Sequence, residues 1–125
     1  MKYLLLIRTN PANAWTGSAD DLRSLRDLLL LHDELAESGE LLGAEGLAEP
    51  ADGRIIDATG TVPVTSDGPF AEAKEQLAGY FLVDCATEGR AIELATRLSA
   101  SQDQPIELRP VMDRSELRRI VGLDS

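Results

Sequence analysis

The fold is decided by the stretch Asp67-Gly68-Pro69-Phe70-Ala71-Glu72-Ala73-Lys74-Glu75, followed by Gln76-Leu77-Ala78-Gly79-Tyr80-Phe81-Leu82-Val83-Asp84. Its first half begins with Gly68-Pro69, a dipeptide typical of turns, and Pro is favoured as the first residue of a short helix. Its second half, residues 77–84, is apolar on both faces of an extended chain. That pattern predicts a strand in the middle of a sheet. The stretch therefore predicts a turn, a short charged helical segment and a central strand in succession.

The rest of the chain supplies the other elements of a small α+β domain. Residues 2–8 are again apolar on both faces and predict a second central strand. Ser18 and Asp21 resemble a capping box, which begins a helix that runs to about Ser38, where Gly39 ends it. Thr87 caps a second helix that runs through Leu98. We expect shorter strands at 41–47 and 106–111, a hairpin at 54–57 and 62–65, and a C-terminal helix at about 114–122, capped by Ser115.

Apolar residues three and four positions apart share one face of a helix, so their spacing predicts which face is buried. We expect the first helix to bury Leu22, Leu25, Leu28, Leu29, Leu35 and Ala36, and the second to bury Ala91, Ile92, Leu94, Ala95 and Leu98. Residues 99–104 are polar and predict a loop. Trp15, in the loop at 9–17, is expected to lie over apolar residues.

The predicted order is β-α-β-hairpin-β-α-β over a single domain, residues 1–125, which suits a ferredoxin-like split βαβ sheet. Two helices cover only one face of such a sheet. The other face would expose alternate residues of 3–7 and 77–83, and these are too apolar for a soluble monomer. A second copy packed on that face would cover it, so we expect a twofold homodimer.

Composition narrows the function classes. A net charge of −10 argues against binding to nucleic acid. The sequence has no run of about 18 apolar residues, so we expect neither a membrane span nor a secretory signal. One Cys, Cys85, excludes an internal disulfide, favours a cytoplasmic location and fits an inert core position. One His and one Cys do not make an ordinary zinc site, and no glycine-rich phosphate loop is present, so we expect no metal and no cofactor.

Two residues are candidates for acid–base chemistry. His32 is the natural general base, because its ordinary pKa lies near neutrality. It also falls on an apolar helical stripe, where a packing role is the alternative. Asp67 is either a cap for the Gly68-Pro69 turn or a carboxylate of a pocket.

Four further residues are candidates for ligand binding. Phe70 is an apolar anchor beside the turn, and Lys74 is either a cleft residue or a partner in a solvated ion pair. Tyr80 and Arg109 are expected on strands. Arg109 is suited to anchor a ligand carboxylate or phosphate, and its alternative is a salt bridge to Glu107.

The string Thr65-Ser66-Asp67-Gly68-Pro69-Phe70-Ala71-Glu72-Ala73-Lys74-Glu75-Gln76-Leu77-Ala78-Gly79-Tyr80-Phe81 resembles the signature of the DGPF branch of the YCII-related (YciI-like) proteins. The start at residues 1–7, the segment 45–47 and the end at 106–112 match as well. The resemblance implies a dimeric α/β barrel of ferredoxin-like protomers. It also implies a His–Asp pair in a dimer cleft and an association with extracytoplasmic-function sigma factors, in a regulatory or stress-response setting.

This chain departs from the YciI-like pattern at the dyad. Those proteins carry an early-helix His and an Asp-Pro-Tyr string after the second helix. Here the single His lies late in its helix, and residues 98–103 contain no such string. Three hypotheses follow: a homodimer with a small-molecule cleft, a cofactor-free dimeric-barrel enzyme (a lyase, isomerase or monooxygenase) that uses His32 or Asp67, and a protein-interaction scaffold.

Overall fold

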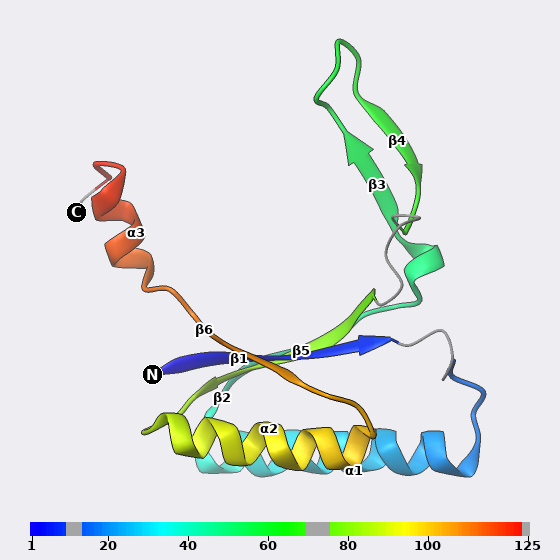
Figure 1. The fold of residues 1–125 in the computed structure, drawn as a ribbon, viewed down its shortest axis with the longest axis vertical. Coiled ribbons are helices and arrows are strands. Elements are labelled where there is room, and N and C mark those ends of the chain that lie inside the picture. Colours follow the sequence, from blue (N-terminus) through cyan, green and yellow to red (C-terminus); the bar gives the residue numbers. More distant parts are fainter. Residues whose placement is uncertain (10–13, 70–75, 124–125) are drawn as a thin grey trace.

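The computed structural model describes residues 1–9, 14–69 and 76–123 (Figure 1). They form an α+β structure, as predicted. Its elements are β1 (Lys2–Thr9), α1 (Ala19–Ser38), β2 (Leu41–Gly46), the 3₁₀ turn η2 (Pro50–Asp52), β3 (Arg54–Asp57), β4 (Val64–Asp67), β5 (Gln76–Asp84), α2 (Glu88–Gln102), β6 (Glu107–Pro110) and α3 (Arg114–Ile120).

The main sheet has four antiparallel strands in the order β2-β5-β1-β6, and β3 pairs with β4 in a separate hairpin. The two strands that are apolar on both faces, β1 and β5, are therefore central, as predicted. In their register Tyr3 lies opposite Val83 and Leu5 opposite Phe81. These four side chains are buried on the side of the sheet that the helices cover.

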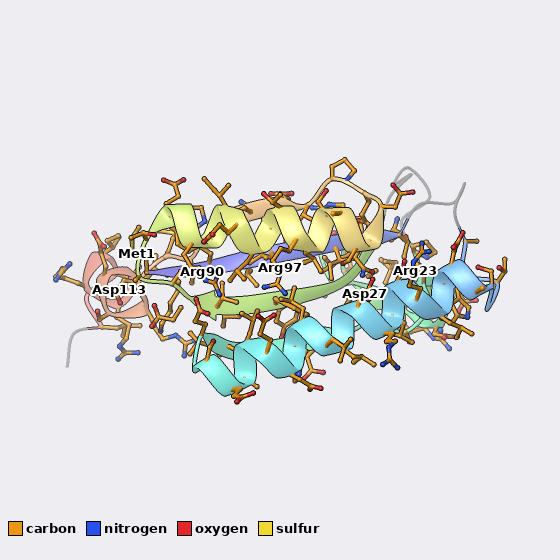
Figure 2. All side chains as sticks on the ribbon, turned by 90° about the horizontal axis from the view of Figure 1, so that it is seen from below. Met1, Arg23, Asp27, Arg90, Arg97 and Asp113 are labelled. Carbon is orange, nitrogen blue, oxygen red and sulfur yellow. The ribbon has the colours of Figure 1, made fainter. Side chains whose placement is uncertain are left out.

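Helices α1 and α2 lie side by side under one face of the sheet (Figures 1 and 2). They contribute Leu31 and Leu35 from α1, and Ala91, Leu94 and Leu98 from α2, to the core. Burial of these apolar side chains is the main favourable term that holds the helices to the sheet. The core therefore lies between the helix layer and one face of β1 and β5.

The opposite face of the sheet carries Leu4, Leu6, Tyr80 and Leu82, because successive strand residues point to opposite sides. The β3–β4 hairpin and α3 rise from this side at the two ends of the sheet (Figure 1). Among the described residues, no helix or strand is layered over the face between them. We call this side of the sheet the open face; its apolar side chains are Leu4, Leu6, Tyr80 and Leu82.

The predicted helix ends are largely confirmed. Ser18 and Asp21 form a reciprocal capping box, and Gly39 ends α1 with φ of 83°, a conformation that favours glycine. Thr87 caps α2 by accepting a hydrogen bond from the Arg90 N–H. At α3 the prediction was wrong: Asp113 is the cap, and Ser115 donates its backbone N–H to that carboxylate.

Two predicted segment boundaries were also wrong. Helix α2 continues to Gln102, because the polar residues at its end find partners: the Gln102 amide donates to the Ser24 carbonyl of α1. The second hairpin strand is β4, Val64–Asp67, so Pro63, which lacks an N–H, lies in the connecting loop rather than in the strand. The Asp57 carboxylate accepts the Thr59 N–H within that loop.

The predicted buried stripe of α1 was wrong in part. Leu28 and Leu35 pack on the core, and so does Leu31, which the prediction omitted. Leu22, Leu25, Leu29 and Ala36 are exposed, as are Ile92 on α2 and Trp15. The prediction failed because α1 has leucines on more than one side. In a single chain, only the side of α1 toward the sheet and α2 is covered.

Candidate functional site

Two of the residues predicted to bind a ligand, Tyr80 and Arg109, lie on the open face, on either side of β1. Tyr80 is half-buried and lies opposite Leu6 of β1 on one side and Glu45 of β2 on the other. Arg109 of β6 lies opposite Leu4 of β1, so it projects to the same side as Tyr80. An apolar floor with a hydroxyl and a guanidinium beside it is suited to hold a small molecule that has both apolar and acidic parts.

Charged side chains line the β6 edge of this face. The Arg8 Nη2 lies 2.9 Å from the Glu107 Oε1, and the Arg109 Nε lies 3.4 Å from the Glu107 Oε2. Arg109 pairs with Glu107, which was one of its two predicted roles. Its side chain is still largely exposed, so the other predicted role, binding a ligand, remains open to it. Because two arginines share one carboxylate, this edge has an excess positive charge in a chain whose net charge is −10.

Asp67 lies at the end of β4, opposite Arg54 in the hairpin register. Its side chain is 88% exposed, and its Oδ1 lies 3.6 Å from the Arg54 Nη1. The next residue makes the close approach: Gly68 donates its N–H to the Gly53 carbonyl at 3.0 Å, and a Cβ on Gly68 would lie 3.2 Å from the Gly53 carbonyl carbon. This geometry explains the glycine of the motif, whereas the carboxylate of Asp67 is an exposed member of a hairpin ion pair.

His32 is on the other side of the sheet. Its ring packs edge-on against Phe81, with 6.3 Å between the ring centroids and 77° between the planes. Phe81 faces the helices, whereas its neighbour Tyr80 faces the open side. The His32 side chain is 40% exposed, and its Nδ1 lies 3.6 Å from the Asp33 Oδ1. The structure thus separates His32 from the open face and from the hairpin that carries Asp67.

Two predicted site residues, Phe70 and Lys74, lie outside the described residues, as does the short helix expected to follow Gly68-Pro69. Cys85 is buried, and burial raises the pKa of its thiol, so the unreactive protonated form persists at neutral pH. The part of the chain that the structure describes has no group of three His, Cys, Asp or Glu residues placed to hold a metal ion.

Two ion pairs of α2 were not predicted, one with Glu34 of α1 and one with Glu40, which lies between the end of α1 and the start of β2. Arg90 binds Glu40 through two hydrogen bonds, Nε to Oε2 and Nη2 to Oε1, both 2.9 Å. Arg97 pairs with Glu34, and both arginines lie on the side of α2 that faces α1 (Figure 2). A shallow hollow between the helices is lined by Asp27, Leu30, Leu31, Glu34, Arg97 and Ser101. The spacing of the two arginines, seven residues apart on α2, was the signal available in the sequence.

These observations define an α+β protein with one sheet face covered by helices and the other open. The YCII-related domain family matches residues 1–115, so the chain belongs to the YCII-related family. It is also 33% identical over 101 residues to a protein of Rhizobium meliloti (strain 1021) named "Uncharacterized protein R00369"; the match covers 79% of this chain and 81% of that protein. Most of α3 lies beyond the residues that the family matches. Within the described ranges, no helix is long and apolar enough to cross a membrane.

Proposed function

We propose that the protein is a homodimer that binds an anionic small molecule between the open faces of its two sheets. The observation that carries the proposal is an apolar face, Leu4, Leu6, Tyr80 and Leu82, that no helix or strand among the described residues covers. Within one chain Leu4, Tyr80 and Leu82 are half-buried and Leu6 is buried, so the face is apolar and only partly exposed. A sheet face that no layer of its own chain covers is typical of an interface. Two ferredoxin-like sheets packed face to face would form a dimeric barrel with this surface inside.

The two projecting elements support the same arrangement. The β3–β4 hairpin exposes Ile56 and Val64, and α3 exposes Ile120 and its C-cap residue, Val121. They stand at opposite ends of the open face (Figure 1). A second copy seated on the sheet would lie between these elements and cover apolar side chains that a monomer leaves in water.

The polar groups of the open face favour an anion as the ligand. Arg109 is the more exposed of the two arginines that share Glu107, and a guanidinium binds a carboxylate or phosphate through two parallel hydrogen bonds. Tyr80 adds a hydroxyl that can donate a hydrogen bond. Because the net charge of the chain is −10, an anion needs a local group of positive charge, and Arg8 and Arg109 supply one at this edge.

The proposal is for binding rather than acid–base catalysis, because the two candidate catalytic residues do not share a site. His32 lies on the helix side of the sheet, and Asp67 lies on the exposed hairpin. We also assign the chain to the DGPF branch of its family, on the basis of Asp67-Gly68-Pro69-Phe70.

Two measurements test this proposal. Light scattering at micromolar concentration should give at least twice the 13.5 kDa mass of one chain. In a thermal-shift screen with inorganic phosphate and succinate as probes, at least one should stabilise the protein. Arg109→Gln should then weaken binding about tenfold or more, since it removes the charged fork.

Arg23→Gln is the matched control. Arg23 is about as exposed as Arg109, 69% against 67%, and also has one ion pair, but it lies on α1 in the helix layer. It should leave the affinity for the probe unchanged. A monomer in solution would overturn the dimer, and equal affinities for the wild type and Arg109→Gln would overturn the ligand site.

A further inference from the structure

Helix α1 carries a second apolar stripe that the single chain leaves uncovered. Leu22, Leu25, Leu29, His32 and Ala36 recur at alternating spacings of three and four residues, which is the a and d pattern of a heptad. Leu22, Leu25 and Leu29 are 56%, 42% and 52% exposed. Successive members of such a pattern form one continuous seam along a helix. We call these five residues the outer stripe of α1.

The outer stripe faces away from α2. Asp27, Leu30 and Glu34 lie on the side of α1 that lines the hollow shared with Arg97 of α2. Residues of a helix are about 100° apart around its axis, which places Leu25 and Leu29 across the sheet-facing stripe from that hollow. Helix α1 contacts β2, and β2 is an edge strand of the sheet. The outer stripe is therefore at the free edge of the molecule.

Two opposite charges border this stripe. Arg26 and Asp33 are seven residues apart, so both occupy the e position of the heptad on the same side of the stripe. Among the described residues Arg26 makes no hydrogen bond and no ion pair. Within residues 1–9, 14–69 and 76–123, the one ion-pair partner of Asp33 is the His32 Nδ1, 3.6 Å from its Oδ1. The g positions lie on the other side of the stripe and are Leu28 and Leu35. Both side chains pack on the core.

We propose that the outer stripe of α1 is a self-association surface, on which the α1 of a second copy packs in antiparallel orientation. Antiparallel packing places the e border of one helix against the e border of the other, so that Arg26 of each copy lies opposite the partner's Asp33. In the same register Leu29 lies opposite the partner's His32, and Leu25 opposite the partner's Ala36. The twofold axis forms each of these contacts twice.

The orientation follows from the charges and from the sheet. In a parallel pair the e positions would meet g positions, which here are buried against the sheet. In the antiparallel pair the g positions of both copies point to the same side of the helix pair. Because these residues pack on the core, both sheets lie on that side, with their β2 edges toward each other. The open face remains free, and this interface is therefore distinct from the sheet-to-sheet dimer of the proposed function.

A charge-swap experiment tests the pairing of Arg26 with Asp33. Sedimentation velocity over a concentration series, in about 0.15 M salt, would compare the wild type with Arg26→Asp, Asp33→Arg and the double variant. Each single variant places like charges opposite each other twice and should raise the dissociation constant about tenfold. The double variant should return it to within about threefold of the wild type. A double variant as weak as either single one would overturn the antiparallel register.

A pair of neighbouring leucines tests the stripe itself. Leu29 and Leu30 are equally exposed, at 52%, but Leu29 belongs to the outer stripe and Leu30 to the hollow beside α2. Leu29→Glu should abolish the association, and Leu30→Glu should leave it unchanged, with far-UV circular dichroism showing that both variants fold. The proposal would be wrong if the two substitutions had the same effect, or if Leu29→Glu left the mass of the wild-type assembly unaltered. Loss of the sheet dimer alone would not produce this difference.

Discussion

At the scale of single residues, Gly79 of β5 is a position where an added side chain would collide with the backbone of β2. A Cβ built on Gly79 would lie 2.8 Å from the carbonyl oxygen of Glu45, a backbone atom that cannot move without disturbing the strand pair. Gly79 also lies next to a register shift in the pairing of β1 with β5, where Ile7 pairs with Gly79 and Arg8 with Leu77. Gly79 is the residue immediately before Tyr80, so it fixes where the open face places that phenol.

Gly79→Ala should therefore destabilise the fold, by about 1–3 kcal/mol, because the added methyl group overpacks the strand pair. Gly43→Ala is the control, since a Cβ on Gly43 of β2 meets no atom within 4 Å. Urea denaturation followed by circular dichroism would give both free energies of unfolding. Equal effects of the two substitutions would contradict the close approach.

The candidate site could be predicted from the sequence only in part. Strand alternation placed Tyr80 on the face opposite Phe81, and it placed Arg109 on a strand near Glu107. It did not determine the position of His32, which belongs to the outer stripe of α1 and whose ring still reaches Phe81 of the sheet. Periodicity relates a residue to its own helix, and the side on which a neighbour packs is a property of the assembled layers.

At the scale of elements, α2 is joined by charges to α1, through Glu34, and to the segment between α1 and β2, through Glu40. The Glu40 carboxylate receives two hydrogen bonds from the Arg90 guanidinium and one from the Ser38 hydroxyl. These bonds, those from Arg90 first, lower the pKa of Glu40 below its ordinary value. A lowered pKa in the folded state means that the ionised carboxylate stabilises the fold.

The contribution of Glu40 to the free energy of unfolding decreases at acidic pH. The contribution of Glu40 is fully present above the ordinary pKa of Glu, about 4.3, and is lost as the pH falls through the lower pKa of the folded state. Glu40→Gln should cost about 1.5 kcal/mol of unfolding free energy at pH 7, the lower end for a charged hydrogen bond, since both side chains are partly exposed. The difference from the wild type should shrink as the pH is lowered below that ordinary value.

Guanidinium denaturation at a series of pH values would measure this difference. Glu34→Gln is the control, because Arg97 of α2 binds the Glu34 carboxylate of α1 in a pair that is more exposed than Glu40–Arg90, and its effect should be smaller. A difference between Glu40→Gln and the wild type that stayed constant down to pH 3 would contradict the assignment.

The elements with the strongest local signals could be predicted from the sequence. Both central strands, the Ser18 capping box, the Gly39 end of α1 and the Thr87 cap agree with the structure. The last turn of α2 could not be predicted, because its two serines, Ser99 and Ser101, have weak helix propensity and the turn is held by a contact to α1, from Gln102 to Ser24. A contact between distant segments leaves no local pattern.

At the scale of the whole molecule, two uncovered apolar surfaces point in different directions. The open face lies on the side of the sheet away from the helices, and the outer stripe of α1 lies at the β2 edge. A molecule that uses both would assemble as a dimer of dimers, with the ligand site inside each sheet pair and α1 joining the pairs. The two interfaces share no residue, so their free energies should be additive.

This arrangement predicts the masses of three variants. Leu82→Glu puts a charge in the middle of the open face, opposite Leu4 and Gly43, and should leave only pairs joined through α1. Leu29→Glu should leave only sheet-to-sheet pairs, and the double variant should sediment as a single 13.5 kDa chain. Only the variants that lose the sheet pair should also lose the stabilisation by an anion.

The control for this set is Ile92→Glu, at an exposed position on α2 outside both surfaces, which should retain the wild-type mass. Leu4→Gln, a milder change on the open face, tests the sheet pair again if Leu82→Glu fails to fold. The sheet pair would be refuted if both open-face variants kept the wild-type mass while folded. If Leu82→Glu alone gave monomers, a single interface would hold the assembly, and the role of α1 would be refuted while the sheet dimer stood.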